Sequence, residues 1–191
     1  MQRDSQVTMA RRIGWFCAIA AAVGLVPTMP ALAQSKDCPE GPPRWVADSR
    51  TGCRVASICP QLDETVLWSG TCVAGLADGK GMLHWYRGSA VVSWYEGEMR
   101  RGMRNGRGTL TVVKGNRYEG DFVDDVMEGR GTLTYANGGR YEGEWKQGRP
   151  DGVGKATLGR HTFEGTWDKG CFIQGQRAAA IGAATSDCEP R

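Results

Sequence analysis

The sequence is poor in histidine, and this limits the reactions that it can support. Only 2 of its 191 residues are histidines, His84 and His161. Nucleophilic catalysis by serine or cysteine usually relies on a histidine that a carboxylate orients. Neither histidine stands at a position that recurs along the chain, and both are expected to be solvated surface residues. No catalytic residue is predicted.

The chain also lacks a strong excess of charge of one sign. Lysine and arginine total 24 against 21 aspartates and glutamates, for a net charge of +3. A nucleic-acid-binding domain carries a strongly basic, clustered face, so no nucleic-acid partner is predicted. The Gly-Lys-Gly and Gly-Arg-Gly triplets are not phosphate loops, because no helix follows to offer its N-terminus to a phosphate. No cofactor is predicted.

Long hydrophobic runs are missing apart from one near the start of the chain. An apolar run over residues 13–26 follows Arg11-Arg12 and precedes Ala31-Leu32-Ala33. A basic region, a short apolar run and an A-x-A site are typical of a secretory signal peptide. The run is too short to predict a transmembrane span. We expect cleavage after residues 1–33, and the alternative is an uncleaved N-terminal anchor.

Cysteine is sparse, and its distribution agrees with export. Of 7 cysteines, Cys17 lies in the apolar run, which leaves 7 − 1 = 6. An even number of cysteines behind a signal peptide indicates disulfides, with the connectivity left open. Zinc is disfavoured because Cys53 and Cys59 lack C-x-x-C spacing, so no metal site is predicted. The disulfide candidates are Cys38, Cys53, Cys59, Cys72, Cys171 and Cys188.

Glycine, by contrast, is abundant, with 28 residues, and many of them recur at a fixed spacing. An aromatic residue, glutamate and glycine begin at Tyr95, Tyr118, Tyr141 and Phe163, with steps of 118 − 95 = 23, 141 − 118 = 23 and 163 − 141 = 22. A Gly-x-Gly triplet follows with the same period. Self-similarity of this kind indicates a repeat architecture.

The glycine offsets also match from Trp68, which places the first repeat earlier than the Tyr-Glu-Gly phrase does. We expect repeats at 68–94, 95–117, 118–140, 141–162 and a degenerate one at 163–175. In the last repeat Gln174 replaces a glycine, and terminal repeats decay because they have one neighbour only. Residues 34–67 form a Cys/Pro-rich N-terminal cap of loops. Residues 176–191 form an alanine-rich tail or a short helix.

Within each repeat the chemical pattern has a period of two. Tyr141, Gly143 and Trp145 fall on one side, and the charged residues between them fall on the other. Turn-forming residues separate the two strands of each repeat. The predicted fold class is therefore all-β: serial β-hairpins form one elongated, twisted antiparallel sheet, with disulfide-held N-terminal loops and a short C-terminal tail or helix.

The two faces of this sheet differ. We name one of them the aromatic face, and it is a candidate partner-binding surface. Either it packs internally, closed by curvature and by the two termini, or it stays a partly open groove for a peptide, glycan or lipid. The other face sets acidic residues near basic residues of adjacent strands and is expected to be solvated. The aromatic face comprises Trp68, Tyr95, Tyr118, Phe122, Tyr141, Trp145, Phe163 and Trp167.

The basic residues of the second repeat and the recurring carboxylates are two further candidate surfaces. Basic residues gather in the second repeat and are candidate contacts for anionic lipid, although interspersed acidic residues favour a plain solvated surface. The recurring carboxylates, such as Glu119 and Glu142, could mimic the paired carboxylates of a glycosidase, but their repetition is better explained by the sheet. The basic set comprises Arg100, Arg101, Arg104, Arg107, Lys114 and Arg117.

At these residues the sequence resembles the MORN repeat family. The family's pattern, roughly Y-x-G-x-W-x-x-G-x-x-x-G-x-G, is met by residues 141–154, and the resemblance covers about 68–175. Asp125 departs from it where a glycine is due. The segment 53–81 is also similar to a cysteine-bearing entry segment of bacterial exported MORN proteins, which implies a Cys53–Cys72 disulfide. Together with it we expect Cys171–Cys188 and Cys38–Cys59.

The resemblance implies a sheet that associates with membranes, lipids or proteins, and it implies no reaction. We therefore expect an exported, non-enzymatic binding or scaffold protein of the cell envelope, located in the periplasm. Its partner would be a protein or another envelope component. Anionic lipid and, less favoured, hydrolysis by the repeat carboxylates are the alternatives. Sheet edges at the terminal hairpins would allow a homodimer.

Overall fold

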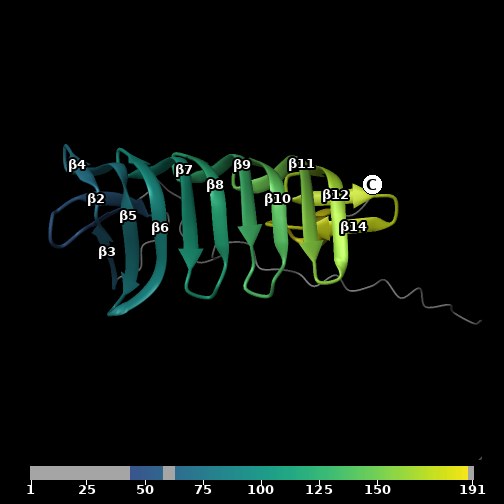
Figure 1. Cartoon of the computed structure of the whole chain (residues 1–191), viewed down its shortest axis with the longest axis horizontal. Helices are drawn as coiled ribbons and strands as arrows, with labels where there is room; N and C mark the ends of the chain where they lie inside the picture. The colour runs from purple at the N-terminus through teal and green to yellow at the C-terminus, as the bar shows by residue number, and fades with distance from the viewer. Residues whose placement is uncertain (1–43, 58–62, 189–191) are drawn as a thin grey trace, which may run out of the picture.

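One β-sheet accounts for nearly all of the residues that the structure describes, 44–57 and 63–188. In this computed structural model the sheet has 14 strands in the order β1-β2-β5-β6-β7-β8-β9-β10-β11-β12-β13-β14, with β3 and β4 also paired to β5. The strands stand side by side along the long axis of the molecule (Figure 1). Among the residues described, no helix is long and apolar enough to cross a membrane.

The bounds of the elements follow the chain in order. They are β1 (Arg44–Ala47), β2 (Arg54–Ser57), β3 (Glu64–Trp68), β4 (Thr71–Val73), β5 (Leu76–Arg87), β6 (Ala90–Arg100), β7 (Met103–Val112), β8 (Arg117–Val123), β9 (Val126–Thr134), β10 (Arg140–Lys146), β11 (Arg149–Leu158), β12 (His161–Asp168), β13 (Cys171–Gln174), β14 (Arg177–Ala180) and a 3₁₀ turn (Thr185–Cys188).

The predicted all-β fold of serial hairpins is confirmed, with one difference in the N-terminal segment. Loops were expected there, but β1 and β2 form an antiparallel hairpin. Its turn is closed by the amide of Gly52, which donates to the carbonyl of Asp48 at 2.7 Å. The hairpin joins the sheet through two parallel contacts, Arg54 with Leu76 and Asp48 with Val66, so the sheet is mixed rather than purely antiparallel.

The alanine-rich tail does not form the helix that was one of two expectations for it. Residues Arg177–Ala180 form β14, which pairs with β13 along its whole length. Ala179 and Ile181 alternate with more exposed neighbours, and both are almost fully buried. A helix this short has little stability of its own, whereas the strand gains a hydrogen-bonded partner and a packed face.

A continuous row of paired glycines crosses the sheet from β5 to β12. We name it the glycine row. The glycine of each strand stands opposite the glycine of the next strand, so neither side of the pair carries a Cβ. Its members are Gly81, Gly97, Gly108, Gly120, Gly131, Gly143, Gly154 and Gly165.

The glycine row exists because the first aromatic ring of each repeat lies over it. A Cβ on Gly97 or on Gly108 would come within 2.5 Å of Cζ of Tyr95, so one ring covers two glycines on neighbouring strands. Tyr118 and Tyr141 lie in the same way over the next two pairs. Real Cβ atoms do not tolerate such distances. The ring and the glycine pair therefore require each other.

The polar tip of the same ring satisfies the backbone. The hydroxyl of Tyr95 donates to the carbonyl of Glu98 at 2.9 Å. The pairing register shifts between Gly97 and Glu98, and a bulge of this kind leaves a residue out of the ladder. Tyr118 and Tyr141 donate in the same way three residues ahead, each beside a register shift. Each tyrosine thus supplies the hydrogen bond that a buried carbonyl needs.

Aromatic rings of successive repeats then contact one another edge to face. The ring centroids of Tyr118 lie 5.1 Å from those of both Phe122 and Trp145, with interplanar angles of 80° and 84°. Tyr141 contacts Trp145 and Trp167 in the same geometry. Such pairs contribute about 0.5–1.5 kcal/mol each beyond their buried area. The core thus contains one row of interlocked rings that runs from β6 to β13.

We predict that alanine at the glycine row is strongly destabilising. A Cβ on Gly131 would lie 2.6 Å from Cζ of Tyr118, so Gly131→Ala should lower the free energy of unfolding by about 3 kcal/mol through overpacking. The control is Gly175→Ala, which has a φ of +59° and no atom within 4 Å of the new Cβ. It measures backbone strain alone, about 1 kcal/mol. Equal losses in urea unfolding would contradict the steric explanation.

Candidate interaction surfaces

The aromatic face proposed from the sequence is the core of the protein. Its eight side chains are between 0% and 4% exposed. Of the two alternatives that the sequence left open, internal packing is the one that the structure shows. A partner cannot reach these rings without displacing the residues that cover them. The functional surface must therefore be sought elsewhere on the sheet.

The opposite face, which we name the outer face, carries the recurring glutamates. Glu119 lies 2.7 Å from Arg117, and Glu142 lies 2.6 Å from Arg140. Both pairs join residues two apart on one strand, whereas Lys155 and Glu164, 2.9 Å apart on β11 and β12, form a pair across strands of the kind that the sequence suggested. The glutamates considered for a hydrolase thus each hold an arginine. Exposed pairs of this kind stabilise a fold little, and they leave the outer face close to neutral.

The acidic residues two positions after these glutamates accept hydrogen bonds from backbone amides instead of pairing with arginines. The side chain of Glu144 accepts a hydrogen bond from the amide of Val153 at 2.9 Å, and Asp121 accepts one from the amide of Arg130 at 3.3 Å. Each carboxylate lies against the first glycine of a Gly-x-Gly triplet, where a Cβ would collide with it. These residues fix the bulged part of each hairpin.

The basic residues of the second repeat do not form one free cationic surface. Arg104 is largely buried, its Nε lies 2.8 Å from Asp125, and its guanidinium sits 5.3 Å from the ring centre of Phe122. Asp125, which replaces a glycine of the repeat pattern, has a φ of +71° and supplies this partner. Arg100 and Arg117 also have carboxylate partners. Arg101, Arg107 and Lys114 are exposed.

An apolar group on the outer face was missed by the sequence reasoning. His84 pairs across strands with Trp94, and its ring centroid lies 6.3 Å from that of Tyr86. All three are partly exposed, on the side opposite to Leu83 and Tyr95, which are 0% exposed. The alternation of side chains along a strand could have placed Trp94 on the outer face, because Trp94 directly precedes the buried Tyr95.

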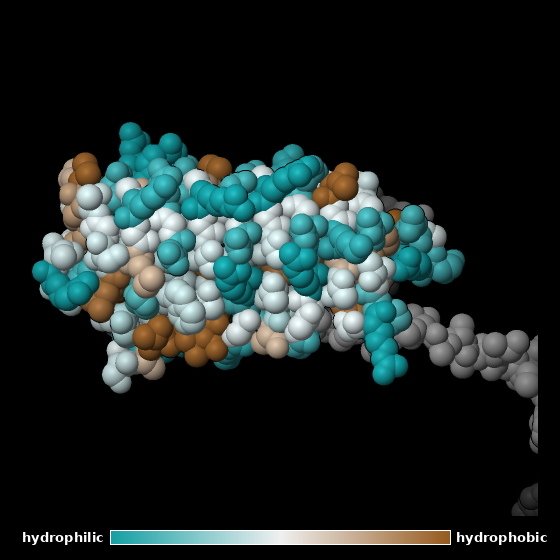
Figure 2. Space-filling view, viewed as in Figure 1, coloured by the Kyte–Doolittle hydropathy of each residue, from teal (hydrophilic) through white to brown (hydrophobic). Residues whose placement is uncertain are grey.

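Val113 extends this group toward the end of β7. It is 57% exposed, and its amide donates to the carbonyl of Val92 at 3.0 Å. We define the outer patch as His84, Tyr86, Trp94 and Val113. Figure 2 shows hydrophobic surface gathered at the lower ends of β6 and β7, while hydrophilic side chains cover the strands further along.

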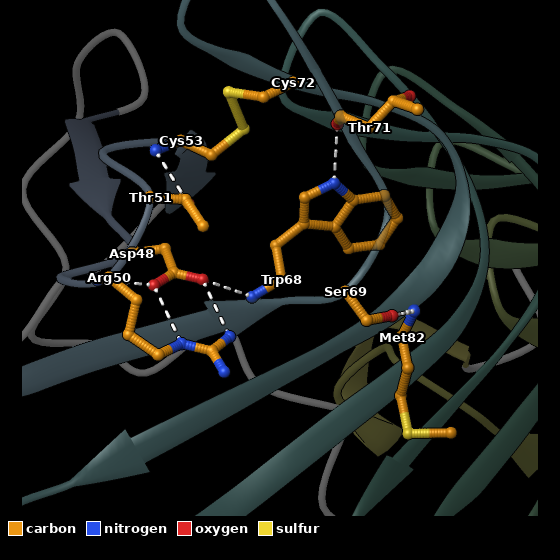
Figure 3. A network of polar contacts seen from close by, with 9 residues as sticks. All are labelled: Asp48, Arg50, Thr51, Cys53, Trp68, Ser69, Thr71, Cys72 and Met82. Carbon is orange, nitrogen blue, oxygen red and sulfur yellow. Dashed lines mark hydrogen bonds and ion pairs between the residues drawn. A yellow bond between two sulfur atoms is a disulfide. The ribbon is translucent and has the colours of Figure 1, made fainter.

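At the N-terminal end, a buried carboxylate joins the first hairpin to the repeats (Figure 3). Asp48 is 0% exposed, and it accepts hydrogen bonds from the amides of Trp68 and Arg50, both at 2.8 Å. Burial by itself raises the pKa of Asp48. The hydrogen bonds from the Arg50 side chain and from the two amides, with the charge of Arg50, outweigh burial and lower the pKa to about 2.

A disulfide closes the same junction. The structure pairs Cys53 with Cys72, next to the Asp48 contacts, and Cys171 with Cys188 at the C-terminal end. These are two of the three pairs that we expected. The third, Cys38–Cys59, lies outside the described residues. Over the described ranges, no group of three or more His, Cys, Asp and Glu side chains is placed to hold a metal ion.

Comparison with known families gives one result. Four consecutive segments, residues 69–90, 95–117, 118–140 and 141–159, match the model of the MORN repeat. They cover the hairpins from β4 to the end of β11, whereas β12 and β13 lie beyond the last matched segment. No curated protein matches the chain.

We predict that Asp48 makes stability depend on acid pH. Its folded pKa lies below the unfolded value of about 4, so its contribution is present above pH 4 and is lost as the pH falls toward 2. Asp48→Asn should lower the free energy of unfolding by about 2 kcal/mol at pH 7 and should flatten the decline below pH 4. The exposed Asp168→Asn is the control for denaturant unfolding at each pH. A decline that persists unchanged in Asp48→Asn would contradict this role.

Proposed function

Because this chain is a MORN-repeat protein, we propose that it is a non-enzymatic scaffold that holds a partner protein against the outer face of its sheet. MORN repeats suggest a binding or scaffold role, and the family is generally non-catalytic. The proposal rests mainly on the outer patch, which places three aromatic side chains on the solvent side of a rigid sheet.

The residues of the outer patch suit protein recognition. Tryptophan and tyrosine are enriched at the centres of interfaces, because they bury a large area at a low cost in conformational freedom. Trp94 is held between β5 and β7, opposite His84 and Thr111. Because the backbone beneath is fixed by the glycine row, the patch would bind without reorganising, and this lowers the cost of association.

We further propose that the protein works in the periplasm after export. The apolar run near the N-terminus, bounded by Arg11-Arg12 and Ala31-Leu32-Ala33, supports export. The two disulfides are compatible with an oxidising compartment. The apolar run bears on export, and the disulfides bear on the redox environment. The partner is to be identified through the outer patch.

Anionic lipid is the second candidate partner. For Arg101, Arg107 and Lys114, no ion pair with a described carboxylate is present. Three cations could attract an anionic surface, at about 1 kcal/mol each close to the membrane. The hydrolase alternative gains nothing from the geometry, because Glu119 and Glu142 are engaged with arginines.

The outer patch makes a prediction for partner capture. Immobilised Trp94→Ser should retain at least tenfold less of its specific partner from an envelope extract than the unchanged protein, because the central aromatic contact is lost. The matched control is Trp45→Ser, since Trp45 is 43% exposed and lies outside the patch. Capture would be quantified by mass spectrometry against blank resin. Equal capture by all three proteins would refute the outer patch as the binding surface.

The lipid candidate is tested by sedimentation with vesicles of neutral lipid, with and without added anionic lipid. If lipid is the partner, binding should need the anionic lipid, should weaken at high salt, and should be lost in the variant Arg101→Gln/Arg107→Gln/Lys114→Gln. The control is Arg140→Gln, which changes an exposed arginine at the start of β10. No sedimentation at low salt would remove this candidate.

A further inference from the structure

The last repeat of the sheet is incomplete, and this leaves one strand edge open. In the third repeat β8 pairs with β9 along its length, with Tyr118 opposite Leu133, Glu119 opposite Thr132 and Gly120 opposite Gly131. In the last repeat β12 takes the place of β8, but it pairs with β13 only at Trp167 and Asp168. From His161 to Thr166, no described strand lies beyond β12.

The direction of the free backbone groups follows from the hairpin geometry. Asp168 and Cys171 flank a two-residue turn, so the amide and carbonyl of Asp168 point toward β13. In an extended strand, every second residue points the same way. The amides and carbonyls of Thr162, Glu164 and Thr166 therefore face the open edge. The guanidinium of Arg177 donates to the carbonyl of Thr162 from that side, which fits this direction.

The edge is accessible apart from Thr162, whose carbonyl accepts the hydrogen bond from Arg177; the same guanidinium lies 5.3 Å from the ring centre of Phe163. Thr162, Glu164 and Thr166 are all exposed. The β13–β14 hairpin crosses behind β12 and its turn projects past it, so β12 is the last upright strand in Figure 1. Phe172 of this hairpin packs on Phe163, with ring centroids 5.6 Å apart, on the buried face and not at the edge.

At the N-terminal end of the sheet, the edge of β3 is partly occupied. There Asp48 forms a β-bridge with Val66 of β3, and the carboxylate of Asp48 accepts a hydrogen bond from the amide of Trp68. Edge strands that natural proteins leave unprotected are templates for pairing with another chain. β12 carries no proline and no register shift against β11 over its length. Over residues 161–166, β12 is thus an edge strand without such protection.

We propose that the free edge of β12 takes up an extended segment of a partner protein by β-strand addition. The segment would occupy the place of the missing second strand of the last repeat. The inference rests on the proposed scaffold role, but it uses a surface separate from the outer patch. The complete repeats show what such a segment must carry at each position.

Three positions define the chemistry of the segment. An apolar residue belongs opposite Phe163, as Leu133 stands opposite Tyr118. Threonine or a basic residue belongs opposite Glu164, as Lys155 stands opposite Glu142. Glycine belongs opposite Gly165, because the ring of Phe172 already lies 3.2 Å from where a Cβ on Gly165 would be.

Charge argues against a second copy of this chain as the occupant. A two-fold antiparallel pair that used all three outward-facing residues would be centred on Glu164, and it would set Thr162 opposite Thr166 of the other copy. The two Glu164 side chains, each 2.9 Å from Lys155 of its own chain, would then stand directly opposite each other. Like charges at directly opposed positions destabilise a sheet. A partner segment with threonine or lysine at this position avoids the repulsion.

The test uses the full chain, labelled with ¹⁵N, and a synthetic peptide that copies residues 127–136, MEGRGTLTYA. This segment contains most of β9, which fills the equivalent place beside β8. Titration should shift the amide resonances of Thr162, Glu164 and Thr166 and should slow their hydrogen exchange. The same peptide with an N-methyl group at the residue that copies Thr132 should bind at least tenfold more weakly. Because only the peptide is modified, the protein is the same in both titrations.

Protein variants provide the matched pair. Thr166→Pro removes the amide that faces the edge and should weaken peptide binding at least tenfold, whereas Thr166→Val keeps the amide and should bind like the unchanged protein. Trp94→Ser should also bind the peptide normally, so that failure here is separable from failure of the outer patch. Unperturbed β12 amides with excess peptide would overturn the proposal. So would a dimer, seen by light scattering, that Thr166→Pro dissociates, since the occupant would then be a second copy.

Discussion

The fold depends on one contact, an aromatic ring that lies flat over two glycines on neighbouring strands. With no Cβ beneath it, the ring of Tyr95 occupies the space above Gly97 and Gly108, and its hydroxyl reaches the carbonyl of Glu98. A single sheet normally needs a second layer to bury one face. Here the rings are that layer. Each ring also meets the rings of the neighbouring repeats edge to face, so that the packing propagates along the sheet.

This constraint separates what the repeat specifies from what the protein does. Tyrosine, glycine and the second aromatic residue of each repeat are used in the core, and the glutamates hold arginines or backbone amides on the outer face. The residues that define the family are therefore unavailable to a partner. The recognition that we propose therefore uses positions outside the pattern, such as Trp94 and Val113. Two MORN-repeat chains can share the whole scaffold and differ in every contact that they make.

The sequence was sufficient for the hairpins, because a fixed offset between aromatic and glycine residues carries both the period and the strand phase. It could not decide whether the aromatic face was open, since that depends on how rings from different repeats tilt against one another. The N-terminal hairpin was missed for a similar reason: the contact of Asp48 with Trp68 joins residues 20 positions apart. Asp125 was seen as a departure from the pattern, but its partner Arg104 is 21 residues away and emerged only in three dimensions.

The changes in the last repeat are physically connected. Tyrosine becomes Phe163, which has no hydroxyl to donate, and β12 has no full second strand of its own repeat against which the register could shift. The second glycine of the pair is absent because β13 turns away, and Phe172 covers Gly165 from behind in place of the repeat's own ring. The tyrosine hydroxyl, the register shift and the second glycine depend on one another in a complete repeat, so the loss of one removes the need for the others. The repeat has thus been converted from a unit that continues the sheet into one that ends it, with its buried face closed and no partner strand beside Glu164 and Thr166.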